Sequence, residues 1–347
     1  MDKLKSLSFD VISNNPSILN SLTSHSDFLG EAPISVLTLL EPDHSLGDVD
    51  LKSSLQMSID DIFALICEVM KELVPREPKG TDFCNYNVVT DKEVKAGDVL
   101  LSYGKSCISE AIWYLDKSDY SHAGIFDGKN SVDMHKEGLC VESLNLLNRR
   151  QSYVHVYRFI SDDGKEMGEK GWSSKPVEKI ITTYKEKKPE YNFPQLFMLA
   201  VLVILKRVPG DERLKKIIKE LLIQLIEVIN KYIFPDGEER FVCSGLVYKC
   251  FEIARPKGKY RLGILDEAYP ELVDMGDSFG DEFPIDLESQ SVDELLTILQ
   301  YRYFIANNIK LTESDEGLRF TEESMAGYVT PGDLQSSSNL KLIGRLS

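Results

Sequence analysis

The apolar residues between positions 97 and 160 fall in short runs bounded by Gly, Asp, Asn or Ser, and several of these runs alternate apolar and polar positions. Runs of this length and pattern predict β-strands. They are GDVLLSYG at 97–104, YSHAGIFDG at 120–128, SVDMH at 131–135 and SYVHVYRF at 152–159. Between the first two, SCISEAIWYLD at 106–116 predicts a helix, because Ser106 can cap it and Glu110 favours its first turn.

Apolar residues recur at helical spacing in other parts of the chain. Every third or fourth position is apolar in segments 58–74, 194–208, 211–234 and 239–254. This period predicts amphipathic helices. We therefore expect an α+β protein with a small antiparallel sheet. A helical and loop-rich region of unknown role covers 1–90, and one domain covers 91–347 with a helical insertion at 161–240.

Composition limits the classes of partner. The chain has 347 residues, 42% of them hydrophobic, a formal net charge of −16 and a pI near 4.9. This charge repels nucleic-acid phosphates and anionic lipid, so neither is an expected partner. The longest apolar run, 197–205, is far shorter than the roughly 20 residues that span a bilayer. We find no secretory signal and expect a cytoplasmic protein without a transmembrane segment; a bacterial effector delivered into a host cell is the alternative.

Two further features bear on partners and cofactors. The stretch 266–294 holds eleven acidic residues and no Lys or Arg, which predicts a solvated loop and, in a binding module, a docking surface for a basic partner. The six cysteines include no CxxC pair. We therefore expect free thiols, no zinc site and no cofactor.

Two of the five histidines lie on what the pattern predicts to be the two arms of one hairpin. If DGKN at 127–130 forms the turn, Gly124 faces Asp133 and His122 faces His135. Opposed residues share one face of a sheet, so both imidazoles point to the same surface, and Gly124 leaves room beside them. The hairpin offers only Asp133 as a further metal ligand, which argues against a metal site.

A nucleophile suited to these histidines stands far away in the chain. Cys243 begins the predicted helix in RFVCSGLVYKCF. A helix N-terminus offers free N–H groups and the positive end of a dipole, which stabilise a thiolate and can hold an oxyanion. An imidazole is the usual base for such a thiol, and a second polar group orients the imidazole. His122 fits the first role, and both His135 and Asp133 fit the second.

The order of these motifs resembles that of a known superfamily. GDVLL, a helix, YSHAGIF, DMH, CSGLVY and TPGDL follow one another as in circularly permuted NlpC-type papain-like proteins. The similarity is nearest to their YiiX-like branch and more distant to lecithin:retinol acyltransferase-like proteins. It covers about 95–160, 190–255 and 326–343. The matched residues are Gly97, Asp98, His122, Cys243, Ser244, Leu246, Val247, Thr330, Pro331, Asp333 and Leu334.

The resemblance implies a cysteine hydrolase or acyltransferase with a permuted papain-like core. Cys243 is then the nucleophile and His122 the base, and the register favours His135 over Asp133 as the third catalytic residue. The expected substrate is a protein, peptide or lipid acyl group. Tyr120, close to His122, and Ser244, next to Cys243, are candidates for substrate contacts. A non-catalytic binding module that retains the fold is the competing hypothesis.

Overall fold

The computed structural model describes the chain from residue 86 onward in several stretches. These are 86–104, 107–116, 118–192, 240–254, 259–264, 286–292, 311–314, 317–320 and 329–347, with single helical residues between 196 and 299. The chain divides into two units, Met1–Ile62 and Phe63–Ser347, and all described residues belong to the second. The helix expected at 58–74, nearly all of the two expected at 194–208 and 211–234, and the acidic stretch before residue 286 lie outside the described residues.

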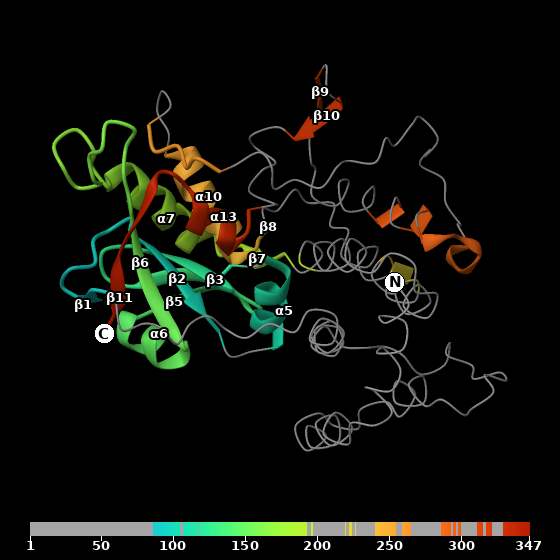
Figure 1. Cartoon of the computed structure of the whole chain (residues 1–347), viewed down its shortest axis with the longest axis horizontal. Helices are drawn as coiled ribbons and strands as arrows, with labels where there is room; N and C mark the ends of the chain where they lie inside the picture. The colour runs from blue at the N-terminus through green and yellow to red at the C-terminus, as the bar shows by residue number, and fades with distance from the viewer. Residues whose placement is uncertain are drawn as a thin grey trace, which may run out of the picture. The chain divides into compact units, whose positions relative to one another are not determined.

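A seven-stranded sheet forms the centre of the described region (Figure 1), in the order β1-β11-β6-β2-β3-β4-β5. Every neighbouring pair is antiparallel except β1 with β11. The strands are β1 Val88–Val89, β2 Val99–Tyr103, β3 His122–Phe126, β4 Ser131–His135, β5 Gly138–Glu142, β6 Tyr153–Phe159 and β11 Leu340–Leu346. The α+β class with a mostly antiparallel sheet is therefore confirmed. The sheet also begins at residue 88, slightly before the domain start expected at 91.

The four predicted strands and the first predicted helix are present, but three strands of the sheet, β1, β5 and β11, are additional. The helix α5 spans Cys107–Asp116, as the pattern indicated. β5 was not predicted because this edge strand is half-exposed and lacks alternation. β11 was not predicted because its apolar residues follow a loop-like Ser and Asn run.

Helices cover both faces of the sheet. The other helices whose bounds fall within the described stretches are α6 Leu144–Arg150, α7 Lys175–Lys187, α10 Cys243–Ile253 and α13 Pro331–Ser336, with a 3-10 turn at Leu287–Ser289. α10 packs against β3 and β4 and touches α7 and α13, as Figure 1 shows. Its Phe251 stacks on Phe159 of β6. The helix expected over 239–254 begins only at Cys243.

Short paired strands complete the architecture. The residues just before α10 form β8, Arg240–Phe241, which pairs in parallel with β7, Glu190–Tyr191. This pairing replaces the first helical turn that the apolar spacing had suggested. A separate antiparallel pair joins β9, Leu311–Ser314, to β10, Gly317–Phe320.

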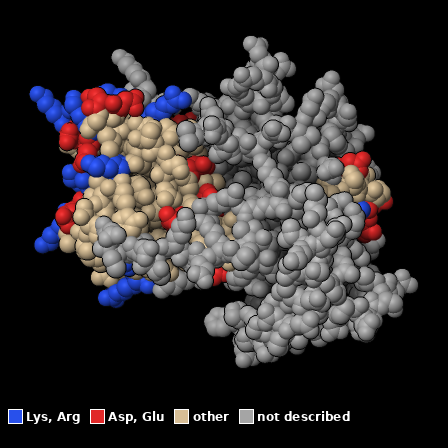
Figure 2. Space-filling model, in the orientation of Figure 1, with Lys and Arg blue, Asp and Glu red and all other residues tan. Residues whose placement is uncertain are grey.

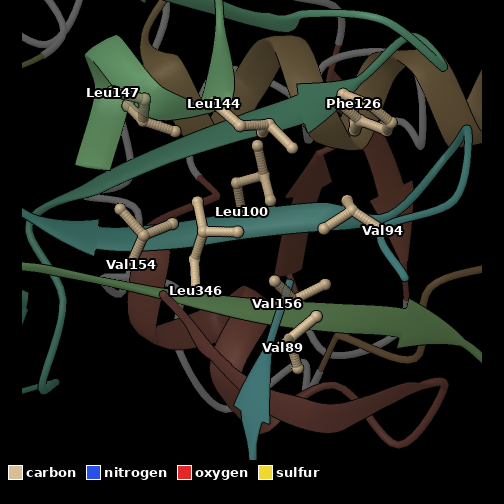
Figure 3. Packing of buried hydrophobic residues seen from close by; sticks show 9 residues of the cluster. All are labelled: Val89, Val94, Leu100, Phe126, Leu144, Leu147, Val154, Val156 and Leu346. Atoms are coloured by element: carbon tan, nitrogen blue, oxygen red, sulfur yellow. The ribbon is translucent and has the colours of Figure 1, made fainter. Parts of the chain in front are cut away.

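The hydrophobic core on the face of the sheet opposite α10 contains residues of both the first strand, β1, and the last strand, β11. Figure 3 shows Leu144 and Leu147 of α6 in one row with Phe126 of β3, above Leu100 of β2 and Val154 and Val156 of β6. Val89 and Leu346, from the first and last strands, belong to the same cluster. Its buried members are Val89, Val94, Leu100, Phe126, Leu144, Leu147, Val154, Val156 and Leu346.

The TPGDL motif near the C-terminus is the start of α13. Thr330 Oγ1 accepts a hydrogen bond from the Asp333 N–H at 3.1 Å, and Asp333 Oδ2 accepts one from the Thr330 N–H at 2.8 Å. This reciprocal capping box, with Pro331 at the first helical position, explains why these residue types occur at this spacing.

The aspartate of the early GD motif forms a buried ion pair. Arg158 donates from Nε to Asp98 Oδ1 at 2.8 Å and from Nη2 to Oδ2 at 2.7 Å. Burial raises the pKa of Asp98, and the hydrogen bonds from Arg158 oppose this rise. Removing either residue would therefore leave the other as a buried charge without its partner.

We expect Arg158→Ala to lower the free energy of unfolding by about 3 kcal/mol, because it leaves the buried Asp98 carboxylate without its ion-pair partner. Urea unfolding monitored by circular dichroism measures this effect. Lys165→Ala is the matched control, since Lys165 pairs with Asp163 at the surface, where a salt bridge contributes about 0.5 kcal/mol. Equal losses in the two variants would contradict the role assigned to Asp98.

A second prediction concerns His155, which is 1% exposed. Its Nδ1 lies 2.6 Å from the Tyr120 hydroxyl, and the Tyr86 ring lies against it. Burial, with a smaller contribution from the charge of Arg345, lowers the pKa of His155 to about 4. The unfolded chain, with a usual pKa near 6.5, therefore binds the proton first as the pH falls.

Stability contributed by neutral His155 is complete above about pH 6.5 and is lost as the pH falls towards 4. We expect wild type to lose about 3 kcal/mol more than His155→Asn between about pH 7 and 4, because asparagine keeps an acceptor for Tyr120 but does not titrate. Urea unfolding of both proteins across this range measures the difference. Parallel pH profiles would contradict a neutral buried imidazole.

Candidate active site

The hairpin of β3 and β4 brings His122 to Asp133. The register pairs Gly124 with Asp133, as the turn predicted. The ladder ends there, so the expected pairing of His122 with His135 is not formed, although their ring centroids are 5.5 Å apart. His122 Nε2 lies 3.1 Å from Asp133 Oδ2, and the Asp133 side chain is fully buried.

Asp133 therefore makes the contact with His122 for which the register had favoured His135. His135 approaches the other carboxylate oxygen, with Nε2 2.9 Å from Asp133 Oδ1. The physical reason lies partly in Gly124, opposite Asp133. A Cβ atom on Gly124 would stand 3.2 Å from the Asp133 Cβ and 3.0 Å from Ser131 Oγ, so a side chain there would crowd Asp133.

Cys243, on α10, is the third member of the group that contains His122 and Asp133. It is the first residue of that helix, is 2% exposed and forms a hydrogen bond with the imidazole of His122. Burial alone would lower the pKa of His122. The negative charge of Cys243, together with hydrogen bonds to Asp133 and Cys243, outweighs burial and raises this pKa to about 10. The imidazole therefore lies where it can take the proton of the Cys243 thiol.

The charge of Asp133 stabilises this pair. Burial would raise the pKa of Asp133, but its contacts with His122 and His135 hold it well below its usual range. An ionised carboxylate accepts a hydrogen bond from the His122 Nε2–H group, which leaves Nδ1 for the thiol of Cys243. The arrangement is a thiol, a base and an orienting carboxylate in sequence.

The start of α10 supplies further positive potential. Its N-cap residue, Val242, makes no side-chain hydrogen bond to the first turn. Cys243, Ser244 and Gly245 are all buried there. Uncapped N–H groups at a buried helix N-terminus favour an anion, such as a thiolate or the oxyanion of a tetrahedral intermediate.

The structure brings one residue to the thiol that the sequence had not indicated. Tyr191 of β7 pairs with Phe241, two residues before Cys243. Burial, with a smaller effect from the charge of Cys243, raises the pKa of Tyr191 well above its usual value. Its phenol is neutral beside the site. No sequence pattern marked it, because β7 has only two residues.

Tyr120 and Ser244, the two candidates for substrate contacts, have their hydroxyl groups bonded inside the protein. The Tyr120 hydroxyl lies 2.6 Å from His155 Nδ1 and 2.9 Å from the Tyr157 hydroxyl. Ser244 Oγ donates to the Val329 carbonyl at 2.6 Å, which ties α10 to the segment before α13. Both side chains are buried.

A cluster with metal-ligand chemistry adjoins the site. Asp133, His135, Cys140 and Glu142 each offer one ligand atom within 4.8 Å of the others. The sequence had counted Asp133 as the only further ligand, because β5 was not foreseen. The guanidinium of Arg150 already contacts Glu142 and His135 in this cluster.

The described surface carries charges of both signs. On the face in Figure 2, Lys and Arg side chains alternate with Asp and Glu around the described region, without a single broad basic band. Within the described stretches, no helix combines the length and apolar character needed to cross a bilayer. The chain matches no protein-family model, and comparison with curated proteins gave no significant match.

Proposed function

We propose that this protein is a thiol-dependent acyl-transfer enzyme, a cysteine hydrolase or acyltransferase with a circularly permuted NlpC-type papain-like core. The observation that carries the proposal is the chain of contacts from Cys243 through His122 to the buried Asp133. The sequence order of the histidine strand before the cysteine helix supports the permuted topology. The uncapped start of α10 supports acyl chemistry, because it offers N–H groups where an oxyanion would form.

The proposed reaction has two steps, formation of a thioester on Cys243 and its breakdown. The thiolate of Cys243 attacks the acyl carbonyl carbon, and the oxyanion is held by N–H groups at the start of α10. As the tetrahedral intermediate collapses, His122 gives its Nδ1 proton to the leaving amine, alcohol or thiol, and a thioester on Cys243 remains.

Water, or an acceptor amine or alcohol, then attacks this thioester while His122 Nδ1 takes its proton. Collapse releases the acid, amide or ester and restores the thiolate–imidazolium pair. Asp133 stays ionised throughout and keeps Nε2 of His122 protonated and oriented. The substrate class is an activated or amide-linked acyl group of a protein, peptide or lipid.

Pre-steady-state assays with p-nitrophenyl acetate and octanoate test the proposal. We expect a burst of nitrophenol close to one equivalent per protein, followed by slower turnover that an added amine accelerates, because the thioester accumulates. Cys250→Ala should retain the burst, since Cys250 is fully buried in the interior of α10. Linear release that is identical in wild type and Cys243→Ala would contradict acyl transfer through this thiol.

A further inference from the structure

The hairpin of β4 and β5 gathers four side chains that can bind a metal ion. Asp133 pairs with Cys140 across the two strands, and His135 and Glu142 each lie two residues further along their own strand. Side chains of opposed and alternate residues share one face of a sheet, so all four lie on the same side. One ligand atom of each lies within 4.8 Å of the others, and we call these four residues the β4–β5 cluster.

One oxygen of Asp133 faces this cluster without a hydrogen-bond partner. The Asp133 side chain is fully buried, and its Oδ2 lies 3.1 Å from His122 Nε2. Its Oδ1 forms no hydrogen bond with any described residue, although His135 Nε2 is only 2.9 Å away. A buried carboxylate oxygen in this condition costs free energy, which a bound cation offsets.

Arg150, the last residue of α6, brings a positive charge to the same cluster. Its Nη2 lies 2.8 Å from His135 Nε2 and donates to Glu142 Oε1, and the guanidinium also forms a hydrogen bond with the Cys140 thiol. Because arginine only donates hydrogen bonds, His135 Nε2 turns a lone pair towards it. Nε2 and Asp133 Oδ1 are therefore two acceptors 2.9 Å apart, an arrangement that a cation in contact with both would stabilise.

We propose that the four residues of the β4–β5 cluster bind one zinc ion, which displaces the guanidinium of Arg150. A thiolate, an imidazole and two carboxylates are ligands that zinc takes, and four ligands complete its tetrahedral shell. The sulfur and nitrogen donors disfavour calcium and magnesium, which take oxygen ligands. The Arg150 side chain is 39% exposed, so it can turn into solvent as the ion enters. The Cys140 thiol gives its proton to water when it binds the ion.

A titration with Co²⁺, a spectroscopic substitute for zinc, tests the proposal. It uses the whole chain with Cys243→Ala, because this variant keeps the β4–β5 cluster and removes the thiol of the candidate active site. We expect one equivalent of Co²⁺ to give the intense visible bands of tetrahedral coordination and a thiolate-to-cobalt charge-transfer band, and Zn²⁺ to abolish both. Adding Cys140→Ser should remove the charge-transfer band, because the sulfur ligand is lost.

Adding Arg150→Gln to Cys243→Ala tests the displacement. We expect Co²⁺ to bind roughly 10-fold more tightly, because the ion no longer competes with charge-assisted hydrogen bonds from the guanidinium. Arg149→Gln is the matched control, since Arg149 is exposed in the same helical turn, and it should leave the affinity unchanged.

Three results would overturn the inference. They are the absence of tetrahedral bands in Cys243→Ala, a charge-transfer band that survives Cys140→Ser, and cobalt affinity in Arg150→Gln that does not exceed that of its parent. None of these measurements depends on turnover. They therefore decide the zinc site whether or not acyl transfer through Cys243 is found.

Discussion

Iodoacetamide is expected to alkylate Cys243 at a rate that stays level from about pH 6 to 9. An ordinary thiol, with a pKa near 8.5, reacts roughly tenfold more slowly for each unit below that value. Here His122, whose pKa is raised to about 10 by the charge of Cys243 and its hydrogen bonds despite burial, remains an imidazolium through this range. A cation beside a cysteine favours the thiolate, which is the form that iodoacetamide attacks. Stopped-flow or mass-based alkylation rates measure the profile.

The variants around this prediction have distinct expected results. Cys243→Ala removes the fast phase completely. His122→Asn removes the imidazolium, so at about pH 6 the rate falls by roughly 100-fold and regains the steep dependence of a free thiol. Cys140→Ala retains the fast phase, because burial raises the pKa of Cys140 and keeps this thiol protonated. A fast phase that survives in Cys243→Ala would assign the reactive thiol elsewhere.

Asp133→Asn is expected to lower kcat by roughly 10²–10³-fold with little change in KM. The amide keeps the shape of the carboxylate, but it removes the charge that stabilises the imidazolium, and its NH₂ group can donate to Nε2 and reverse the tautomer of His122. The pKa of His122 falls towards its usual value as this contact is lost, so the alkylation profile of Cys243 becomes steeper with pH.

His135→Gln is the matched comparison for this variant. His135 touches Asp133 and acts on His122 only through it, so we expect a loss of roughly 10-fold or less. Thermal melts of both proteins separate a loss of activity from a loss of folding. A larger loss in His135→Gln than in Asp133→Asn would show that His135, and not Asp133, orients the base.

The parts of the site that follow from local pattern could be predicted from the sequence. Strand alternation and the turn at 127–130 placed Asp133 opposite Gly124, and helical spacing placed Cys243 near the start of a helix. Motif order joined these two distant segments. Each of these predictions needed only a period or a turn type, which a few neighbouring residues determine.

The choice between His135 and Asp133 could not be made in that way. Alternation puts both side chains on one face, and the close packing of Asp133 against Gly124 and His122 is a matter of tertiary geometry. Arg150 reaches the site through α6 and the half-exposed edge strand β5, which leave weak apolar patterns. Tyr191 approaches through a two-residue strand. Such contacts depend on tertiary packing, which periodicity does not encode.

Trapping an acyl group on Cys243 tests the central claim most directly. The wild-type protein is incubated with acetyl and octanoyl thioesters, quenched in acid, and analysed by intact mass and peptide mapping. We predict one added acyl group per chain, located on the peptide that contains Cys243 and released by neutral hydroxylamine, as a thioester requires. An unmodified protein, or an acyl group that remains in Cys243→Ala, would contradict acyl transfer through this cysteine.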